Sequence, residues 1–253
     1  MQNRYVCDIG DFGKYALLRA LIRDDLRLGV VWYLNPNEEE NCDGSLVTYL
    51  QNANESGFRS GDPELYDALR RLLRRGQRNI LSVQQSGILR APTLFYDAPL
   101  TFAGVDLAKR KGHRDRWCRE ALEATEKAQI VFFDPDNGLP GKTAKPWSKN
   151  GPKYVFPEEL LPYVQRDQSL IVYQHRNRTT LSKQIEAGKK IFRGLAEHST
   201  VWALTHHNRM YFVMPSLNLE NILRERLHEF VAGPWKDRFR TQDQDLLTSP
   251  SSE

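Results

Sequence analysis

Short apolar runs alternate with amphipathic segments along most of this chain. Runs rich in β-branched and aromatic residues are typical of buried strands, and they occur at 30–34, 80–83, 100–105, 130–133, 170–173, 200–204 and 210–214. Apolar residues at helical spacing predict helices at 12–24, 45–52, 63–75, 114–127, 158–164, 180–197 and 217–230. This alternation predicts an α/β fold in which helices cover both faces of a mostly parallel sheet.

The last two predicted strands differ from the others in their connection. Only the short segment His206-His-Asn-Arg209 separates them, which allows a hairpin and therefore an antiparallel final strand. We expect a Rossmann-like, doubly wound, mostly parallel sheet of seven strands with a terminal antiparallel hairpin.

Most of the chain is expected to form one domain. The predicted domain spans 1–240 and includes a helical N-terminal extension at 1–28, while the polar segment 241–253 is expected to be a flexible tail. The segment 140–157 is rich in Gly, Pro and Lys and contains Trp147, which predicts an ordered surface loop or a substrate lid.

The composition is that of an ordinary soluble protein, with 253 residues of which 40% are hydrophobic and 27% charged. No apolar run approaches the roughly 20 residues that span a bilayer, and the first residues lack the features of a secretory signal. Three scattered cysteines make neither a disulfide framework nor a zinc-ligand pair. We expect a cytoplasmic protein with no membrane partner. The formal charge of +4 does not identify a polyanionic partner, and the oligomeric state stays open.

The run Ile130-Val-Phe-Phe is followed directly by Asp134-Pro-Asp136-Asn137-Gly138. Proline cannot continue a sheet ladder and Gly138 permits a positive φ, so the strand must end here and its polar residues must lie at its tip. In an open α/β sheet, ligands bind at the carboxyl ends of the strands. The turn is therefore a candidate site, although an Asx-type turn that merely ends a strand has the same composition.

Basic residues gather near two predicted strand ends. One group flanks the helix at 114–127 and the other follows the strand at 170–173, so both are expected to share a rim with Asp134 and to contact phosphates. The candidate substrate-binding residues are Lys111, Arg114, Arg116, Trp147, Arg176 and Arg178. The alternative is that these charges form solvated faces.

This order of elements, with Asp-Pro at the tip of the fourth predicted strand, resembles the class I S-adenosylmethionine-dependent methyltransferases. Asp134-Pro135 looks like the start of the Asp/Asn-Pro-Pro-Tyr motif of the N6-adenine methyltransferases. The run Asp8-Ile-Gly-Asp-Phe-Gly-Lys14-Tyr is similar in spacing to the opening of the bacterial 23S ribosomal RNA adenine-N6 methyltransferases. In that family the lysine contacts the cofactor, so the resemblance implies the same role for Lys14.

The chain departs from this family at the cofactor loop and in the catalytic motif. The segment 35–44 should be rich in glycine, because missing side chains let backbone amides approach the cofactor, yet it contains only Gly44. Asn35 and Asp106 are the remaining candidates for cofactor contacts beside Lys14 and Asp134. The second proline and the aromatic residue of the motif are replaced by Asp136 and Asn137.

The resemblance implies N-methyl transfer from S-adenosylmethionine to a nucleic-acid base, with Asp134 accepting a hydrogen bond from the exocyclic amine. Trp147, Tyr154 or Tyr173 would have to supply the missing stacking platform.

Two other functions fit the same residues. Asp134 and Asp136 suit a Mg²⁺ or Mn²⁺ site of a nuclease or phosphohydrolase, with Asn137 beside them and His175 as general base; His206 or His207 could also contribute. The other alternative is a non-catalytic module that binds a nucleotide or nucleic acid.

Overall fold

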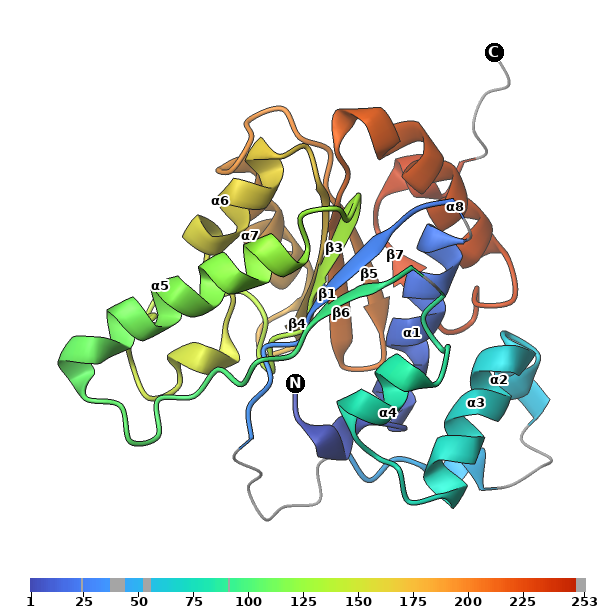
Figure 1. Ribbon diagram of the computed structural model, residues 1–253. Helices are drawn as coiled ribbons and strands as arrows, with labels where there is room; N and C mark the ends of the chain where they lie inside the picture. Colours follow the sequence, from blue (N-terminus) through green and yellow to red (C-terminus); the bar gives the residue numbers. More distant parts are fainter. Residues whose placement is uncertain (24, 37–43, 52–55, 91, 249–253) are drawn as a thin grey trace.

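A mixed seven-stranded sheet lies at the centre of the protein (Figure 1). This computed structural model describes residues 1–23, 25–36, 44–51, 56–90 and 92–248. The strands are β1 Leu28–Val31, β2 Leu94–Tyr96, β3 Ile130–Phe133, β4 Ser169–His175, β5 Trp202–His206, β6 Arg209–Met214 and β7 Arg240–Thr241. Their order is β2-β1-β3-β4-β6-β5-β7. The first four strands of this order are parallel, whereas β6 is antiparallel to both β4 and β5, and β7 is antiparallel to β5.

Helices cover both faces of the sheet (Figure 1). One face carries α5 Leu107–Ala124, α6 Pro157–Gln165 and α7 Leu181–Arg193, and the other carries α1 Ile9–Ile22, α3 Pro63–Arg74 and α8 Glu220–Ala232. Shorter helical segments are α2 Ser56–Arg59, α4 Ile80–Gln85 and the 3-10 turns Asn3–Tyr5, Thr48–Leu50, Gly151–Lys153, Leu217–Leu219 and Gln244–Leu246.

The central strand β3 is apolar throughout because both of its faces are buried. Val131 and Phe133 belong to the core under α5, α6 and α7, whereas Ile130 and Phe132 belong to the core under α1 and α8. All four side chains are 1% exposed or less. This packing fixes the position of the residues that follow β3.

Two of the predicted strands are wrong. Residues 80–83 lie in α4, where the side chain of Asn79 accepts a hydrogen bond from Ser82 N at 2.8 Å and so caps the helix. Residues 100–105 form no strand, and the second strand is instead β2. Short apolar runs do not distinguish strands from buried helical turns, which explains the error. Asp134 therefore follows the third strand of the chain, not the fourth.

The C-terminal segment also differs from the expected flexible tail. Beyond residue 240, β7 pairs with β5, and the side chains of Asp243 and Asp245 accept hydrogen bonds from Ala203 N and Trp202 Nε1 at 2.7 and 2.6 Å. Leu246 is fully buried. Residues 241–246 thus complete the core, and a domain boundary at 240 would cut through it.

None of the helices in the described parts of the chain combines the length and apolar character needed to cross a bilayer.

Candidate functional site

The turn after β3 is fixed by contacts to its neighbours on the sheet. Asp134 N donates to Val31 O at 3.0 Å, which continues the pairing of β3 with β1. Gly138 has a φ of +97°, as its place in the sequence predicts, and a Cβ here would overlap Gln174 on β4. The Gln174 side chain donates to Asn137 O and accepts from Leu139 N, at 3.0 and 2.8 Å. The turn is therefore attached to the ends of β1 and β4.

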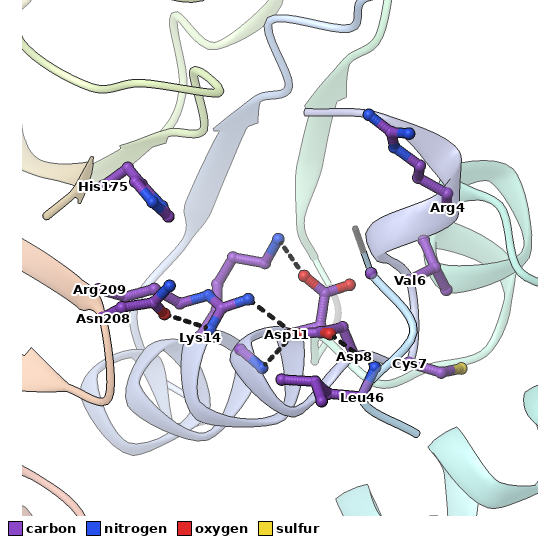
Figure 2. Close-up of polar contacts among 12 residues, drawn as sticks. Arg4, Val6, Cys7, Asp8, Asp11, Lys14, Leu46, His175, Asn208 and Arg209 are labelled. Atoms are coloured by element: carbon purple, nitrogen blue, oxygen red, sulfur yellow. Dashed lines mark hydrogen bonds and ion pairs between the residues drawn. The ribbon is translucent and has the colours of Figure 1, made fainter. Parts of the chain in front are cut away.

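The start of α1 lies against the same end of the sheet. Asp8 caps the helix by accepting a hydrogen bond from Gly10 N at 2.9 Å, and it also accepts one from Leu46 N at 3.2 Å. Arg209, the first residue of β6, contacts the Asp8 carboxylate at 2.6 Å (Figure 2). Asp8 thereby joins α1 to the antiparallel part of the sheet.

Lys14 joins α1 to Asp134. Its ammonium lies 2.8 Å from Asp134 Oδ2 and 2.7 Å from Asp11 Oδ1 (Figure 2 shows the Asp11 contact). The three side chains are 5% exposed or less. Burial alone would lower the pKa of Lys14, but the two carboxylates hold that pKa above its ordinary value. Lys14 is therefore a charged residue shared by two buried acids.

The second acid, Asp11, has an unusual ionisation. Burial raises its pKa, Lys14 opposes the rise, and the charges of Asp134 and Asp8 add to it, so that the pKa is about 6. The hydroxyl of Tyr15 donates a hydrogen bond to Asp11 Oδ2 at 3.1 Å. Asp11 is thus a weaker acid than an ordinary aspartate.

These residues surround a cavity of about 450 Å³ between the start of α1 and the ends of β3, β4 and β6. Figure 2 shows His175 and Arg209 on one side of this hollow and Arg4 on the other. Tyr173 and Tyr211 form part of the wall, and the rings lie 6.0 Å apart. Tyr211 is fully buried, and its hydroxyl has no hydrogen-bond partner among the described residues. The cavity therefore combines charged, aromatic and unsatisfied polar groups.

Met1 lines the part of this cavity at the ends of β1 and β3, a part that we call the crevice. The amino group of Met1 donates to Tyr33 O at 3.1 Å and to Asp134 O at 2.9 Å, and it pairs with Asp136 Oδ1 at 2.8 Å. The amide of Gln2 reaches the other Asp136 oxygen at 2.8 Å. Burial would raise the pKa of Asp136, yet the amino group and Gln2 keep that pKa below its ordinary value. Two carbonyls and a carboxylate thus form an ammonium site.

Backbone strain marks the edges of this region. Tyr33, two residues after β1, is 2% exposed and has a φ of +45°. Cys7, directly before the cap of α1, has a φ of +70°. Positive φ values are uncommon for such residues and tend to occur at functional sites.

The predicted catalytic residues lie together. Asp134, Asp136, Asn137 and His175 all line the cavity, as does Lys14, the predicted cofactor contact. Asn35 is beside the crevice, where its N–H donates to Met1 O at 2.9 Å. Most of the expected cofactor loop, at 37–43, lies outside the described residues.

Asp106 lies elsewhere. It precedes α5, its side chain is 76% exposed, and it does not line the cavity. The acid at a strand tip is instead Asp97, which directly follows β2 and accepts a hydrogen bond from Gln84 at 3.1 Å. The run Leu94-Phe-Tyr before Asp97 was the sequence signal for this strand end.

The predicted substrate-binding residues do not line the cavity around Asp134. Arg114 is 1% exposed and pairs with Glu159, with Nη2 3.0 Å from Oε2. Lys111 pairs with Asp115 at 2.7 Å and lies near the Trp147 ring. Arg114 and Trp147 instead line a second, mostly apolar cavity of about 690 Å³ beside α5 and α6. Arg116 and Arg178 are exposed, and Arg176 contacts the 207–208 connection.

The prediction that the basic residues of α5 share a rim with Asp134 is therefore wrong. This helix covers the opposite face from α1, so its basic residues are not brought beside Asp134 (Figure 1). The cations that line the cavity are Arg4, Lys14, Lys153 and Arg209.

From the sequence, His206 is only one of two histidines that could contribute to a metal-dependent site. It is 1% exposed, and it stacks on Phe239 with ring centroids 4.7 Å apart. Burial and, to a smaller extent, the charges of His207 and Arg209 lower its pKa to about 3. A Cβ at Gly13 would overlap its ring, just as one at Gly10 would overlap Arg209. The two glycines of α1, three residues apart, were the signal that this helix approaches another part of the chain closely.

Within the described residues, no group of three or more His, Cys, Asp or Glu side chains could hold a metal ion. No protein-family model matches the sequence, and no curated protein matches it significantly.

Proposed function

We propose that this protein is a cytoplasmic enzyme with a Rossmann-like, doubly wound sheet that transfers a methyl group from S-adenosylmethionine to an amino group of a nucleic-acid base. The observation that carries the proposal is the position of Asp134, which lies at a strand tip in a cavity of about 450 Å³ and is held there by Lys14. Antiparallel pairing of β5 and β6 supports the resemblance to class I methyltransferases.

Asp134 has the properties that this reaction requires. Lys14 contacts Oδ2 of this carboxylate at 2.8 Å. A carboxylate oxygen at the cavity wall can accept a hydrogen bond from an exocyclic amine and take its proton when the nitrogen is methylated. Because Asp134 is 3% exposed, its orientation is maintained by packing and by Lys14.

An aromatic side chain beside Asp134 supports a planar base as the acceptor. Tyr173 lines the cavity, and its hydroxyl lies 3.2 Å from His175 Nδ1. Tyr154 packs its ring against Phe156, and Trp147 lies at the second cavity. Of the three aromatic residues expected to replace the missing motif residue, Tyr173 is thus the one in reach of a base at Asp134.

The crevice between β1 and β3 fits the ammonium end of the donor, because the carbonyls of Tyr33 and Asp134 already accept hydrogen bonds from an amino group. Tyr33 adopts the positive φ that a glycine would supply in a typical cofactor loop. Asp97, at the tip of the neighbouring strand, is suited to hold ribose hydroxyls. When bound, the donor supplies an electrophilic methyl group. Met1 must leave the crevice for the donor to enter.

The contacts of the two acids favour this function over metal catalysis. Asp134 is paired with Lys14, and Asp136 with the amino group of Met1. A Mg²⁺ or Mn²⁺ ion bound by both carboxylates would have to displace both cations. The nuclease and the non-catalytic binding module are therefore kept as the alternatives that the experiment below distinguishes.

Transfer of a labelled methyl group from S-adenosylmethionine to RNA and DNA tests the proposal. We expect Asp134→Ala to lose about a hundredfold or more of the rate, because the acceptor is lost, and Asp134→Asn to retain part of it. Asp115→Ala, which removes an exposed acid on α5, is the matched control and should retain the transfer. Full activity in Asp134→Ala would remove Asp134 from the reaction. Cleavage of the nucleic acid that requires Mn²⁺ and both acids would establish the nuclease instead.

A further inference from the structure

The C-terminal half of α3 is strongly basic. Between Asp67 and Asp97 the sequence contains six arginines and no aspartate or glutamate. Four of these arginines lie in the last turns of α3 or directly after it, and we call them the arginine strip: Arg70, Arg71, Arg74 and Arg75. At about 100° of helical rotation per residue, the four positions fall within an arc of about 140°. The strip therefore occupies one side of the helix.

The acids of α3 do not neutralise this strip. Glu64 lies 2.9 Å from Arg19, and Asp67 lies 2.8 Å from Arg59, so both acids of the helix already have a cation. None of the four arginines of the strip forms an ion pair within the described residues. The C-terminal end of a helix carries only about half a negative charge, which cannot balance four guanidinium groups. Three of the four side chains are exposed, so the strip presents positive charge to solvent.

Arg78 fixes the end of α3 beside the cavity that contains Asp134. Its guanidinium donates to Val6 O at 2.8 Å and also to the carbonyls of Arg4 and Gly44. Arg4 and Gly44 themselves line the cavity. Figure 1 shows the end of α3 on the same side of the molecule as the N-terminal turn. The arginine strip is thus an outward continuation of the cationic wall of the cavity.

The residue types of the strip indicate phosphate groups as its ligands. The segment 63–79 contains no lysine, and the planar guanidinium of arginine matches two phosphate oxygens at once. A helix that binds a membrane surface would combine its cations with large exposed apolar side chains. None of the exposed large apolar side chains in the described parts of the chain lies on α3. These features favour a nucleic-acid backbone over a lipid surface.

We propose that the arginine strip binds the sugar-phosphate backbone of a single-stranded nucleic acid, one base of which enters the cavity at Asp134. The inference rests on the proposed function for the role of that base, and it adds the surface that holds the neighbouring nucleotides. The strand has to be single at this point because Asp134 is 3% exposed, and a base stacked in a duplex does not reach such a position.

Binding of a fluorescent single-stranded RNA of mixed sequence to the whole protein, followed by anisotropy across a series of salt concentrations, tests the inference. The test variant is Arg71→Gln with Arg75→Gln. The matched control is Arg116→Gln with Arg119→Gln on α5. Each variant removes two exposed arginines and the same total charge, so a difference between them reports the place of binding.

We expect the α3 variant to flatten the log–log salt dependence by about 1.4, which corresponds to two phosphate contacts on a single strand, and to bind roughly tenfold or more weakly at 100 mM salt. The α5 variant should stay within about twofold of the wild type. Both variants should unfold at the temperature of the wild type, because the altered side chains are exposed.

Equal losses of RNA binding in the two variants would overturn the inference, and methyl transfer to RNA by the wild type would then leave the proposed function standing. Wild-type binding to phosphatidylserine vesicles that the α3 variant loses, without binding to RNA, would also overturn the inference and assign the strip to a membrane surface. RNA binding that only the α3 variant loses, without any methyl transfer by the wild type, would support the strip and overturn the proposed function alone.

Discussion

At the scale of single residues, Lys14 determines the geometry of the site more than any other side chain. Its ammonium touches two acids from different elements, Asp11 on α1 and Asp134 after β3. It also lies 5.0 and 5.4 Å from the ring centroids of Tyr15 and Trp32. A buried ion pair is weak evidence of stability, but loss of one partner is strongly destabilising because the other charge remains buried.

Lys14→Met should therefore destabilise the fold in a pH-dependent manner. The folded-state pKa of Asp11 is already raised to about 6, and it rises further without the ammonium, so stability is retained at low pH and lost as the pH rises. We expect a loss of about 3–5 kcal/mol at pH 8 and a smaller one at pH 5, measured by urea unfolding. Lys111→Met, which removes an exposed ion pair, is the control and should change stability by under about 1 kcal/mol at either pH. Equal losses at both pH values would show that Lys14 does not lower the pKa of Asp11.

His206 has the opposite pH dependence. Its folded-state pKa is about 3, below the ordinary 6.5, so the protein loses stability as the pH falls below 6.5 and the unfolded chain gains a proton. His206→Leu should reduce the difference in unfolding free energy between pH 7 and pH 5 by about 2 kcal/mol, because one proton no longer contributes. His198→Leu, at an exposed position, should preserve the wild-type difference. An unchanged difference in His206→Leu would mean that the buried imidazole is protonated in the folded protein.

At the scale of elements, the close approach of α1 to the β5–β6 connection forms the site. Gly10 and Gly13 make it possible, because side chains there would overlap Arg209 and His206. Alanine normally stabilises a helix relative to glycine. A Gly→Ala change that instead lowers the free energy of unfolding therefore shows that the helix packs closely at that position.

Gly13→Ala should destabilise the protein by about 1–3 kcal/mol, because the buried ring of His206 has to move. Gly112→Ala in α5, where a Cβ would meet nothing within 4 Å, should stabilise it by about 0.5–1 kcal/mol. Thermal unfolding measures both. Stabilisation by Gly13→Ala would show that α1 does not pack against His206.

The elements that could be predicted from the sequence are those with strong local signals. Pro135 and Gly138 marked the end of β3, and the turn has the predicted positive φ. The apolar run at 80–83 was mistaken for a strand although Asn79, a residue type that favours helix N-caps, precedes it. The residues that complete the site, Arg209 and Tyr211, depend on the antiparallel register of β6, which places them beside α1. Such long-range contacts are not visible in a local pattern.

At the scale of the whole molecule, the distribution of charge matters more than the net charge of +4. Acids lie on the floor of the cavity, and Arg4 and Lys153 are further cations of its wall. The basic residues of α5 are paired or lie on the other face. A nucleic acid that brings a base to Asp134 should therefore place phosphates near Arg4 and Lys153.

Lys153→Ala should flatten the salt dependence of nucleic-acid binding by about one phosphate contact, a change of about 0.7 in the log–log slope for a single strand. Arg116→Ala on α5 is the matched control and should leave the slope unchanged. Fluorescence anisotropy across a series of salt concentrations measures both. A flatter slope for Arg116→Ala with an unchanged slope for Lys153→Ala would place the nucleic acid on α5.

A crystal structure of the protein with S-adenosylmethionine tests the central claim most directly. We predict donor density in the crevice between β1 and β3, with its ammonium at the carbonyls of Tyr33 and Asp134 in place of Met1, and its methyl group directed toward the cavity at Asp134. A crevice still filled by Met1 at saturating donor, together with a Mn²⁺ ion bound by Asp134 and Asp136 in a parallel soak, would contradict it.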